Sequence, residues 1–288
     1  MHHSVLRLRV VVGKRQVDKF WVTTTTTRTI DSHKKDAPEK LPSLGFSAAV
    51  VCKPHPEKAH RGGEDAFFVA ANGQGMGVFD GVGSWAEVGV DPSAYARSLA
   101  KECNTRLFAT GSTDPTDLLQ YAFLNSASLR GSSTACVATL DNLGVFRATT
   151  VGDSVFFVIR NGSIFFRQKE LQHGFNYPFQ LGENSTDTPE SGAKVTLELK
   201  EGDIVIMCTD GVTDNLFDEE LLGSVEMGGS HQEMAQHIAE SASRRAKSRG
   251  ATTPFSKTAN THGFQHVGGK LDDITVIVAF VTENKSEK

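Results

Sequence analysis

The sequence lacks the patterns of several common catalytic and cofactor sites. No Gly-x-x-x-x-Gly-Lys-Ser/Thr loop is present to cradle the phosphates of a nucleotide, and no Gly-x-Ser-x-Gly turn is present to carry a serine nucleophile. The 10 histidines form no HExxH pattern. These absences disfavour nucleotide-dependent kinases and ATPases, and hydrolases that depend on those motifs.

Cysteines are also few. The four cysteines, Cys52, Cys103, Cys136 and Cys208, are widely separated and include no CxxC pair, which disfavours a zinc site or a disulfide framework. Free thiols fit a reduced, intracellular compartment. Because Cys136 and Cys208 lie inside apolar, strand-like runs, we expect them to be buried thiols.

Long apolar runs and excess charge are missing as well. No apolar run approaches the roughly 18 residues that a transmembrane helix needs, so we predict no integral membrane segment. The net charge is −4 and the pI is about 6.2, which gives no sign of nucleic-acid binding. The chain has 288 residues, 39% of them hydrophobic, which suffices for one large core. We expect a monomer.

The first 43 residues differ from the rest in composition. They are basic and rich in hydroxyl groups, as in the run from Thr23 to Thr27, and before Asp36 they contain only Asp18 and Asp31 as acids. This composition is typical of an organelle transit peptide, and it does not separate a mitochondrion from a plastid. The alternative is an N-terminal extension without a targeting role, in which case we expect a cytoplasmic protein.

From residue 44 to residue 283 the chain alternates apolar runs with turn signals such as Asn72-Gly73, Asp141-Asn142 and Asn161-Gly162. Strands are predicted at 45–52, 65–71, 76–79, 134–140, 144–151, 154–160, 163–168, 193–199, 203–208 and 274–281. Helices are predicted at 92–108, 114–129, 218–224 and 230–249. Hairpin-linked strands with helices between groups predict an α+β domain of antiparallel sheets covered by helices. Residues 284–288 form a tail.

Five short acidic motifs lie at the ends of these apolar runs. They are Glu64-Asp65, Asp80-Gly81, Gly152-Asp153, Asp210-Gly211 and Asp272-Asp273. Alone, Glu64-Asp65, Asp80-Gly81 and Gly152-Asp153 are more typical of a turn or a solvated loop, whereas Asp272-Asp273, directly before a β-branched run, is unusual for a solvated segment. Together, however, the strands can carry carboxylates to one end of a core, where their repulsion is most simply relieved by a hard divalent cation. Because successive strand side chains point to opposite faces, only one of Glu64 and Asp65 can face such a cation directly. For Asp153 we favour a structural turn in which its carboxylate accepts hydrogen bonds from backbone amides.

In their order, these motifs resemble the metal-dependent type 2C protein phosphatases, over about residues 47–281. The resemblance rests on Glu64-Asp65, Asp80-Gly81, Ser132-Ser133-Thr134-Ala135, Gly152-Asp153-Ser154, Thr209-Asp210-Gly211 and Asp272-Asp273-Ile274-Thr275. The runs Pro54-His55-Pro56, Gly62-Gly63, Phe175-Asn176, Pro178–Gly182 and Gly268-Gly269-Lys270 are similar to an organellar subgroup related to bacterial sporulation phosphatases. The resemblance implies two stacked antiparallel sheets flanked by helices, with metals at one end.

The resemblance also implies a ligand set for two Mg²⁺ or Mn²⁺ ions. Asp80 is expected to bridge the ions. Glu64 and the Gly81 carbonyl complete the protein ligands of one ion, and Asp210 and Asp272 those of the other. Asp80 and Asp210 are therefore the expected catalytic residues. All these donors are oxygens, as the two cations prefer.

The implied reaction is hydrolysis of phosphoserine or phosphothreonine in a protein substrate by a water that the two metals activate. Asp65 is expected to act indirectly, by holding a metal-bound water. Arg61 is expected to bind the phosphoryl group, although the arginine of the family lies one residue earlier, where this chain has His60. Segments 168–190 and 252–269 are expected to carry substrate specificity.

Two further departures leave alternatives open. Many relatives have a histidine after the Asp-Gly as proton donor, whereas this chain has Val82; a metal-bound water and His173 are the remaining candidates. The aspartate that supports a third metal in some relatives aligns near Leu129, so we expect that site to be absent or weakened. The alternatives to a protein phosphatase are a pseudophosphatase that binds phosphorylated partners and a hydrolase of small phosphate esters.

Overall fold

Apolar runs become the strands of two five-stranded sheets in the computed structural model, which describes residues 43–283. The first sheet has the order β1 (Leu44–Lys53), β14 (Ile274–Glu283), β13 (Ile204–Cys208), β7 (Val155–Arg160), β8 (Ser163–Arg167). The second has the order β12 (Ala193–Glu198), β6 (Val145–Val151), β5 (Ala135–Leu140), β3 (Gly75–Asp80), β2 (Asp65–Val69). All neighbouring strands in both sheets are antiparallel, as predicted.

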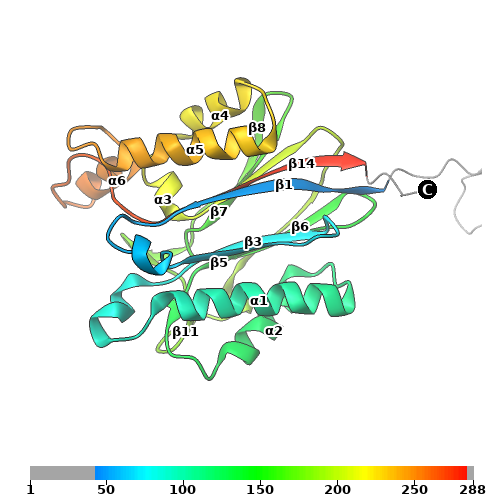
Figure 1. The fold of residues 1–288 in the computed structure, drawn as a ribbon, viewed down its shortest axis with the longest axis horizontal. Coiled ribbons are helices and arrows are strands. Elements are labelled where there is room, and N and C mark those ends of the chain that lie inside the picture. Colours follow the sequence, from blue (N-terminus) through cyan, green and yellow to red (C-terminus); the bar gives the residue numbers. More distant parts are fainter. Residues whose placement is uncertain (1–42, 284–288) are drawn as a thin grey trace, which may run out of the picture. The chain divides into compact units, whose positions relative to one another are not determined.

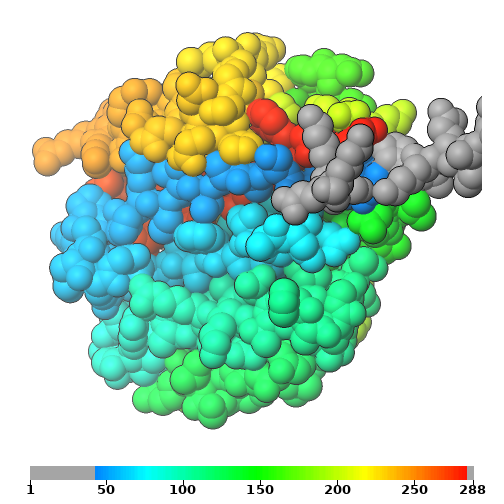
Figure 2. All heavy atoms as spheres, turned by 45° about the vertical axis from the view of Figure 1, so that its right-hand side comes forward, coloured from blue at the N-terminus to red at the C-terminus, as the bar shows by residue number. Residues whose placement is uncertain are grey.

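The two sheets stack face to face and helices cover both outer faces (Figure 1). Over the first sheet lie α3 (Asp210–Thr213), α4 (Asp218–Glu226), α5 (His231–Ala246) and α6 (Pro254–Thr261). Over the second lie α1 (Pro92–Thr110) and α2 (Pro115–Ser126). In the space-filling view β1, in blue, separates the yellow and orange helices from the green ones (Figure 2). The predicted α+β fold of two stacked antiparallel sheets is confirmed.

Short elements complete the described chain. They are β4 (Ser132–Ser133) paired with β11 (Leu181–Gly182), β9 (Gln172–Gly174) paired with β10 (Tyr177–Pro178), and the 3-10 turns η1 (Ala59–Arg61), η2 (Gly83–Val88) and η3 (Pro189–Ser191). The hairpin predicted at Asn161-Gly162 is confirmed, since both residues have positive φ, 52° and 72°. The proposed targeting segment, except Ser43, and the tail 284–288 lie outside the described residues.

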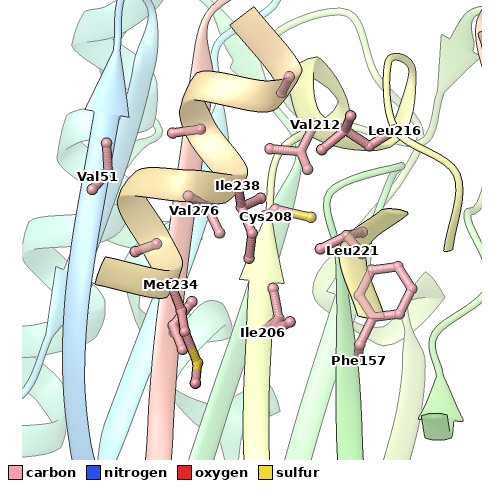
Figure 3. Packing of buried hydrophobic residues seen from close by; sticks show 14 of the residues in the cluster. Val51, Phe157, Ile206, Cys208, Val212, Leu216, Leu221, Met234, Ile238 and Val276 are labelled. Atoms are coloured by element: carbon pink, nitrogen blue, oxygen red, sulfur yellow. The ribbon is translucent and has the colours of Figure 1, made fainter. Parts of the chain in front are cut away.

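Central strands of the first sheet are buried on both faces, which explains their continuous apolar runs. On β13, Ile206 and Cys208 pack against the α5 side, whereas Val205 and Met207 face the second sheet. Figure 3 shows Met234 and Ile238 of α5 lying over these strands. Cys136 and Cys208 are fully buried free thiols, as predicted.

Some predicted boundaries were wrong. The helix expected to continue to residue 129 ends at Ser126, and the one expected to continue to residue 249 ends at Ala246. The run 134–140 begins instead at Ala135, because Ser132-Ser133 pairs separately with β11. No helix among residues 43–283 is both long and apolar enough to cross a bilayer.

Candidate metal centre and active site

Strand ends bring the predicted acids to one end of the sandwich. Asp65 begins β2 and Asp80 ends β3, and the antiparallel register places them opposite each other. In the other sheet Asp210 follows the end of β13, and Asp272 closely precedes β14. Since β13 and β14 are antiparallel neighbours, the end of one lies beside the start of the other.

Hydrogen bonds between the two sheets fix this arrangement. The Thr209 hydroxyl donates to Oδ2 of Asp65 at 2.9 Å, and the Glu64 amide donates to Oδ2 of Asp273 at 2.9 Å. The His55 amide donates to the other oxygen of Asp273 at 2.6 Å. Asp65 and Asp273 are almost fully buried, so these bonds hold the two groups of acids against each other.

Gly81 and Gly211 have a steric role in the two Asp-Gly motifs. A Cβ atom on Gly211 would lie 1.9 Å from the backbone oxygen of Asp273. A Cβ atom on Gly81 would lie 2.5 Å from the Pro92 oxygen and 2.8 Å from the Glu64 oxygen. Glycine thus allows each aspartate-bearing segment to approach the backbone beside it.

Burial and mutual repulsion disfavour ionisation of several of these acids. Desolvation, followed by the charge of Asp65, raises the pKa of Asp80 well above its usual value. Desolvation and the charge of Asp273 likewise raise the pKa of Asp65. Desolvation and the charge of Asp210 raise the pKa of Asp272. A bound cation would offset both effects.

Two lysines that the sequence interpretation had not assigned lie among the acids. The Lys270 ammonium is 2.6 Å from Oδ2 of Asp210, 2.7 Å from Oδ2 of Asp214 and 3.3 Å from Oδ2 of Asp272. Although burial alone would raise the pKa of Asp210, the Lys270 charge lowers it below its usual value. The Lys58 ammonium bonds Glu64 and lies 3.6 Å from Asp273.

The sequence indicated the places of Lys270 and Asp214 near the acids, but not that of Lys58. Lys270 stands two residues before Asp272 in the sequence. Asp210 begins α3 and Asp214 directly follows that helix, so the two aspartates are four residues apart, a spacing that places side chains on the same face of a helix. Lys58 had no such signal, because its contact with Asp273 joins residues far apart in the chain.

Arg61 lies at the site and His60 does not contribute to it. The Arg61 guanidinium donates to Oε1 of Glu64 at 2.5 Å, and its side chain is 36% exposed. His60 is exposed and its Nδ1 contacts the Glu57 carbonyl. Arg61 therefore lies beside the acids, although the phosphate-binding arginine of the family aligns one residue earlier, with His60.

Asp153 belongs to the neighbourhood of the acids, and its expected bonds to backbone amides are not found within residues 43–283. Instead, Gln172 donates its side-chain amide to Asp153 at 3.1 Å. Desolvation and the charge of Asp210 raise the pKa of Asp153 to about 7. The neighbouring His173 is held by Asp187, 2.9 Å from its Nε2, and stacks on Phe179.

The donor set fits a hard cation. Oδ1 of Asp65 and Oδ1 of Asp210 are buried and have no hydrogen-bond partner within the described chain. All candidate donors are oxygens, as Mg²⁺ and Mn²⁺ prefer. No three acidic, histidine or cysteine side chains of residues 43–283 already converge as a metal cluster. Glu64 is bonded to Lys58 and Asp210 to Lys270, so both carboxylates would have to exchange a lysine ammonium for the cation.

Comparison with known proteins gives consistent matches. A family model described as Stage II sporulation protein E (SpoIIE) matches residues 86–282. The Arabidopsis thaliana protein named probable protein phosphatase 2C 80 is 41% identical over 252 residues, or 85% of this chain and 60% of that protein. The chain spans 60%, 51% and 44% of the length of three curated plant relatives that it matches.

Solved structures are similar as well. The photosystem II phosphatase PBCP superposes with a TM-score of 0.79 and 33% identity, covering 83% of this chain and 99% of that one. The catalytic domain of the serine threonine protein phosphatase PstP, in complex with two manganese ions, has a TM-score of 0.64 and 17% identity, with 84% and 100% covered. Because the identity to PstP is only 17%, this similarity shows a shared fold.

Proposed function

We propose, because the chain belongs to the type 2C family of protein phosphatases, that it hydrolyses phosphoserine and phosphothreonine in proteins with the aid of Mg²⁺ or Mn²⁺. The observation that carries the proposal is the junction of the two sheets, where Asp65 meets Thr209 and Glu64 meets Asp273. This junction gathers oxygen donors whose repulsion a divalent cation would offset.

Five groups would hold two ions: the side chains of Glu64, Asp80, Asp210 and Asp272 and the carbonyl of Gly81. When bound, the ions would supply positive charge at the phosphoryl oxygens and lower the pKa of the attacking water. The buried, unpartnered oxygen of Asp210 supports this assignment.

Other side chains would orient the substrate and the attacking water. Asp65, held by the Thr209 hydroxyl, would accept a hydrogen bond from that water and keep it in line with phosphorus. Arg61 is half-exposed and bonds a carboxylate, so it would exchange Glu64 for a phosphoryl oxygen of the substrate. Val82 cannot donate a proton and Nε2 of His173 is engaged by Asp187, so we assign protonation of the leaving oxygen to water.

We also propose that the protein acts as a monomer in a mitochondrion or plastid. The basic, acid-poor composition of residues 1–43 supports an organelle. The plastid is supported by the similarity to a photosystem II phosphatase. Fusion of residues 1–60 to a fluorescent protein tests the location: diffuse cytosolic fluorescence would contradict it. Sedimentation of the purified protein tests the monomer.

Hydrolysis of phosphopeptides and of p-nitrophenyl phosphate tests the activity. We expect turnover with Mn²⁺, loss of turnover in EDTA, and loss of at least about 100-fold in kcat for Asp80→Ala, because Asp80 would help to hold the ions that activate the water. Asp117→Ala is the matched control, since Asp117 lies on α2 in an ion pair with Arg106. Activity that persists in EDTA would contradict the metal mechanism.

A pseudophosphatase is the second candidate, favoured by Val82 in the position of the family's proton donor. It would bind Mn²⁺ and phosphopeptides without hydrolysing either peptides or p-nitrophenyl phosphate. A small-ester hydrolase would turn over p-nitrophenyl phosphate but no phosphopeptide. The two substrates in one assay therefore separate the three candidates.

A further inference from the structure

A hollow adjoins the acids and has no role in the proposed reaction. Its volume is about 360 Å³. It lies between the chain that follows β8, the junction of α3 and α4, and α6. Its lining includes Glu170, Phe175, Asp214, Phe217, Glu219 and Phe255. We call this hollow the acidic aromatic pocket.

One wall of the acidic aromatic pocket is preformed by stacked aromatic rings. The ring of Phe175 lies 5.4 Å from that of Phe255, 5.2 Å from that of Phe264 and 5.2 Å from that of His262. These contacts join segments 168–190 and 252–269, the two segments expected from the sequence to carry substrate specificity. Since Phe255, Phe264 and His262 all pack against Phe175, the position of the Phe175 ring in the wall is set before any ligand binds.

The lining carries an excess of negative charge. Its acids are Glu170, Asp214, Asp218 and Glu219, and its only base is Arg167. Arg167 is engaged by Glu170 at 3.3 Å and by Asp218 at 3.1 Å. The Glu219 side chain is exposed and makes no ion pair with any other residue of 43–283. Asp214 is paired with Lys270 at 2.7 Å. Glu219 is therefore the carboxylate of the lining that is free to attract a cation.

Aromatic walls of the pocket already attract cationic side chains. The Lys257 ammonium lies 4.6 Å from the centre of the Phe217 ring, and the Lys270 ammonium lies 5.3 Å from that of Phe255. These distances are in the range of cation–π attraction. A ligand that combines an apolar stem with a positive end would satisfy both the rings and the carboxylates.

The acidic aromatic pocket also lies next to the reaction centre. Asp214 lines the pocket, and the same Lys270 ammonium that bonds Asp214 also bonds Asp210. A peptide whose phosphorylated residue reaches Asp210 would extend within a few residues to the pocket.

We propose that the acidic aromatic pocket binds an arginine or lysine side chain of the phosphoprotein substrate, a few residues from the phosphorylated one. The proposal rests on the proposed phosphatase function and specifies its substrate class: phosphorylated sites with a nearby basic residue. Glu219 is the specificity-determining residue, and it lies outside the catalytic set.

Binding of labelled peptides that carry a non-hydrolysable phosphonate in place of phosphoserine tests the proposal. In each peptide one position within four residues of the phosphonate is arginine, norleucine or glutamate, and the dissociation constant is measured by fluorescence anisotropy with Mn²⁺ present. At the best position we expect arginine to bind at least about fivefold tighter than norleucine, as one cation–π and carboxylate contact would give, and glutamate to bind more weakly than both.

Variants on α4 identify the pocket as the source of this preference. Glu219→Gln should reduce the preference for arginine to less than about twofold, and Glu226→Gln should leave it unchanged, because Glu226 lies at the other end of the helix and outside the lining. Equal binding of arginine and norleucine at every position, or a preference that Glu219→Gln does not change, would overturn the proposal.

Turnover of p-nitrophenyl phosphate separates the two proposals. This small ester cannot reach the pocket, so Glu219→Gln should hydrolyse it as fast as the wild type. Turnover of the ester without an arginine preference would overturn only the pocket assignment. An arginine preference in binding without any turnover would support the pocket and contradict the catalytic function.

Discussion

The ammonium nitrogen of Lys270 lies 2.6 Å from Oδ2 of Asp210, a residue that we assign to a metal ion. The same nitrogen contacts Asp272, which we assign to the same ion. Lys270 thus supplies positive charge between two expected ligands of one cation. It stabilises the gathered acids of the metal-free protein and competes with the cation for them.

Lys270→Met should therefore have opposite effects on folding and on metal binding. We expect the metal-free protein to lose about 3 kcal/mol of unfolding free energy, since removal of one partner leaves buried carboxylates unpaired. We expect Mn²⁺ to bind more tightly, because its competitor is gone. Urea unfolding in EDTA and calorimetric titration with Mn²⁺ measure the two effects. Lys101→Met is the control, as Lys101 is exposed and its one ion pair within residues 43–283 is with Glu102. Weaker Mn²⁺ binding by Lys270→Met would refute the competition.

Thr209→Val should weaken the junction between the sheets. The variant keeps the shape of the side chain but removes the donor to Asp65, so we expect a loss of about 1–3 kcal/mol in unfolding free energy. Thr209→Ser should restore most of it, because serine retains the hydroxyl. Thr196→Val on the exposed face of β12 should change the stability little. Chemical unfolding in EDTA measures all three, and an unchanged Thr209→Val would show that the bond contributes nothing.

Stability without metal should fall as the pH rises through the titration range of Asp153. The pKa of this carboxyl is near 3.8 when unfolded and about 7 when folded. Between these values the folded protein retains a proton that the unfolded chain has lost, so Asp153 contributes stability at low pH and loses it as the pH approaches 7. Asp153→Asn removes this loss. We expect wild type and variant to be similar near pH 4, and the variant to be more stable by a few kcal/mol at about pH 7.

Guanidinium unfolding in EDTA at several pH values measures this difference. Asp141→Asn is the control for a general effect of removing an acid: Asp141 is a half-buried turn residue that pairs with Arg147, and asparagine keeps the oxygen that accepts from the Leu143 and Val145 amides. A stability difference between Asp153→Asn and wild type that stays constant from pH 4 to pH 7 would refute the assignment of the titration to Asp153.

Gly211→Ala should disturb the metal centre through the backbone. The added Cβ would collide with the carbonyl oxygen of Asp273, so the segment bearing Asp210 must shift. We expect a loss of about 1–3 kcal/mol in unfolding free energy, as for other overpacked sites, and weaker Mn²⁺ binding. Gly223→Ala is the matched control, because Gly223 lies in α4 with open space around it. The control should gain up to about 1 kcal/mol from helix propensity. Equal Mn²⁺ affinity of Gly211→Ala and wild type would argue against the steric role.

Local sequence signals predicted most of the elements and missed those that lack a long apolar run. The strands β13 and β14 were clear because both faces are buried. The helix α6 was missed, although Thr253 and Ser256 form a capping box and Pro254 stands at the first helical position. The short strands β9, β10 and β11 gave no signal, since two or three residues are too few for a period to be read.

The sequence by itself determined that the acids Glu64, Asp80, Asp210 and Asp272 stand at strand ends, because strand periodicity and turn residues are local properties of the chain. Their assignment to a cation stays a prediction that the family resemblance implies. The tertiary structure alone decided what surrounds them. Strand order brings Lys58 to Asp273 and Thr209 to Asp65, and it sets Phe175 against Phe255 to form the wall of a pocket. Such contacts depend on the packing of distant segments, and electrostatic and aromatic contacts act only at close range in space.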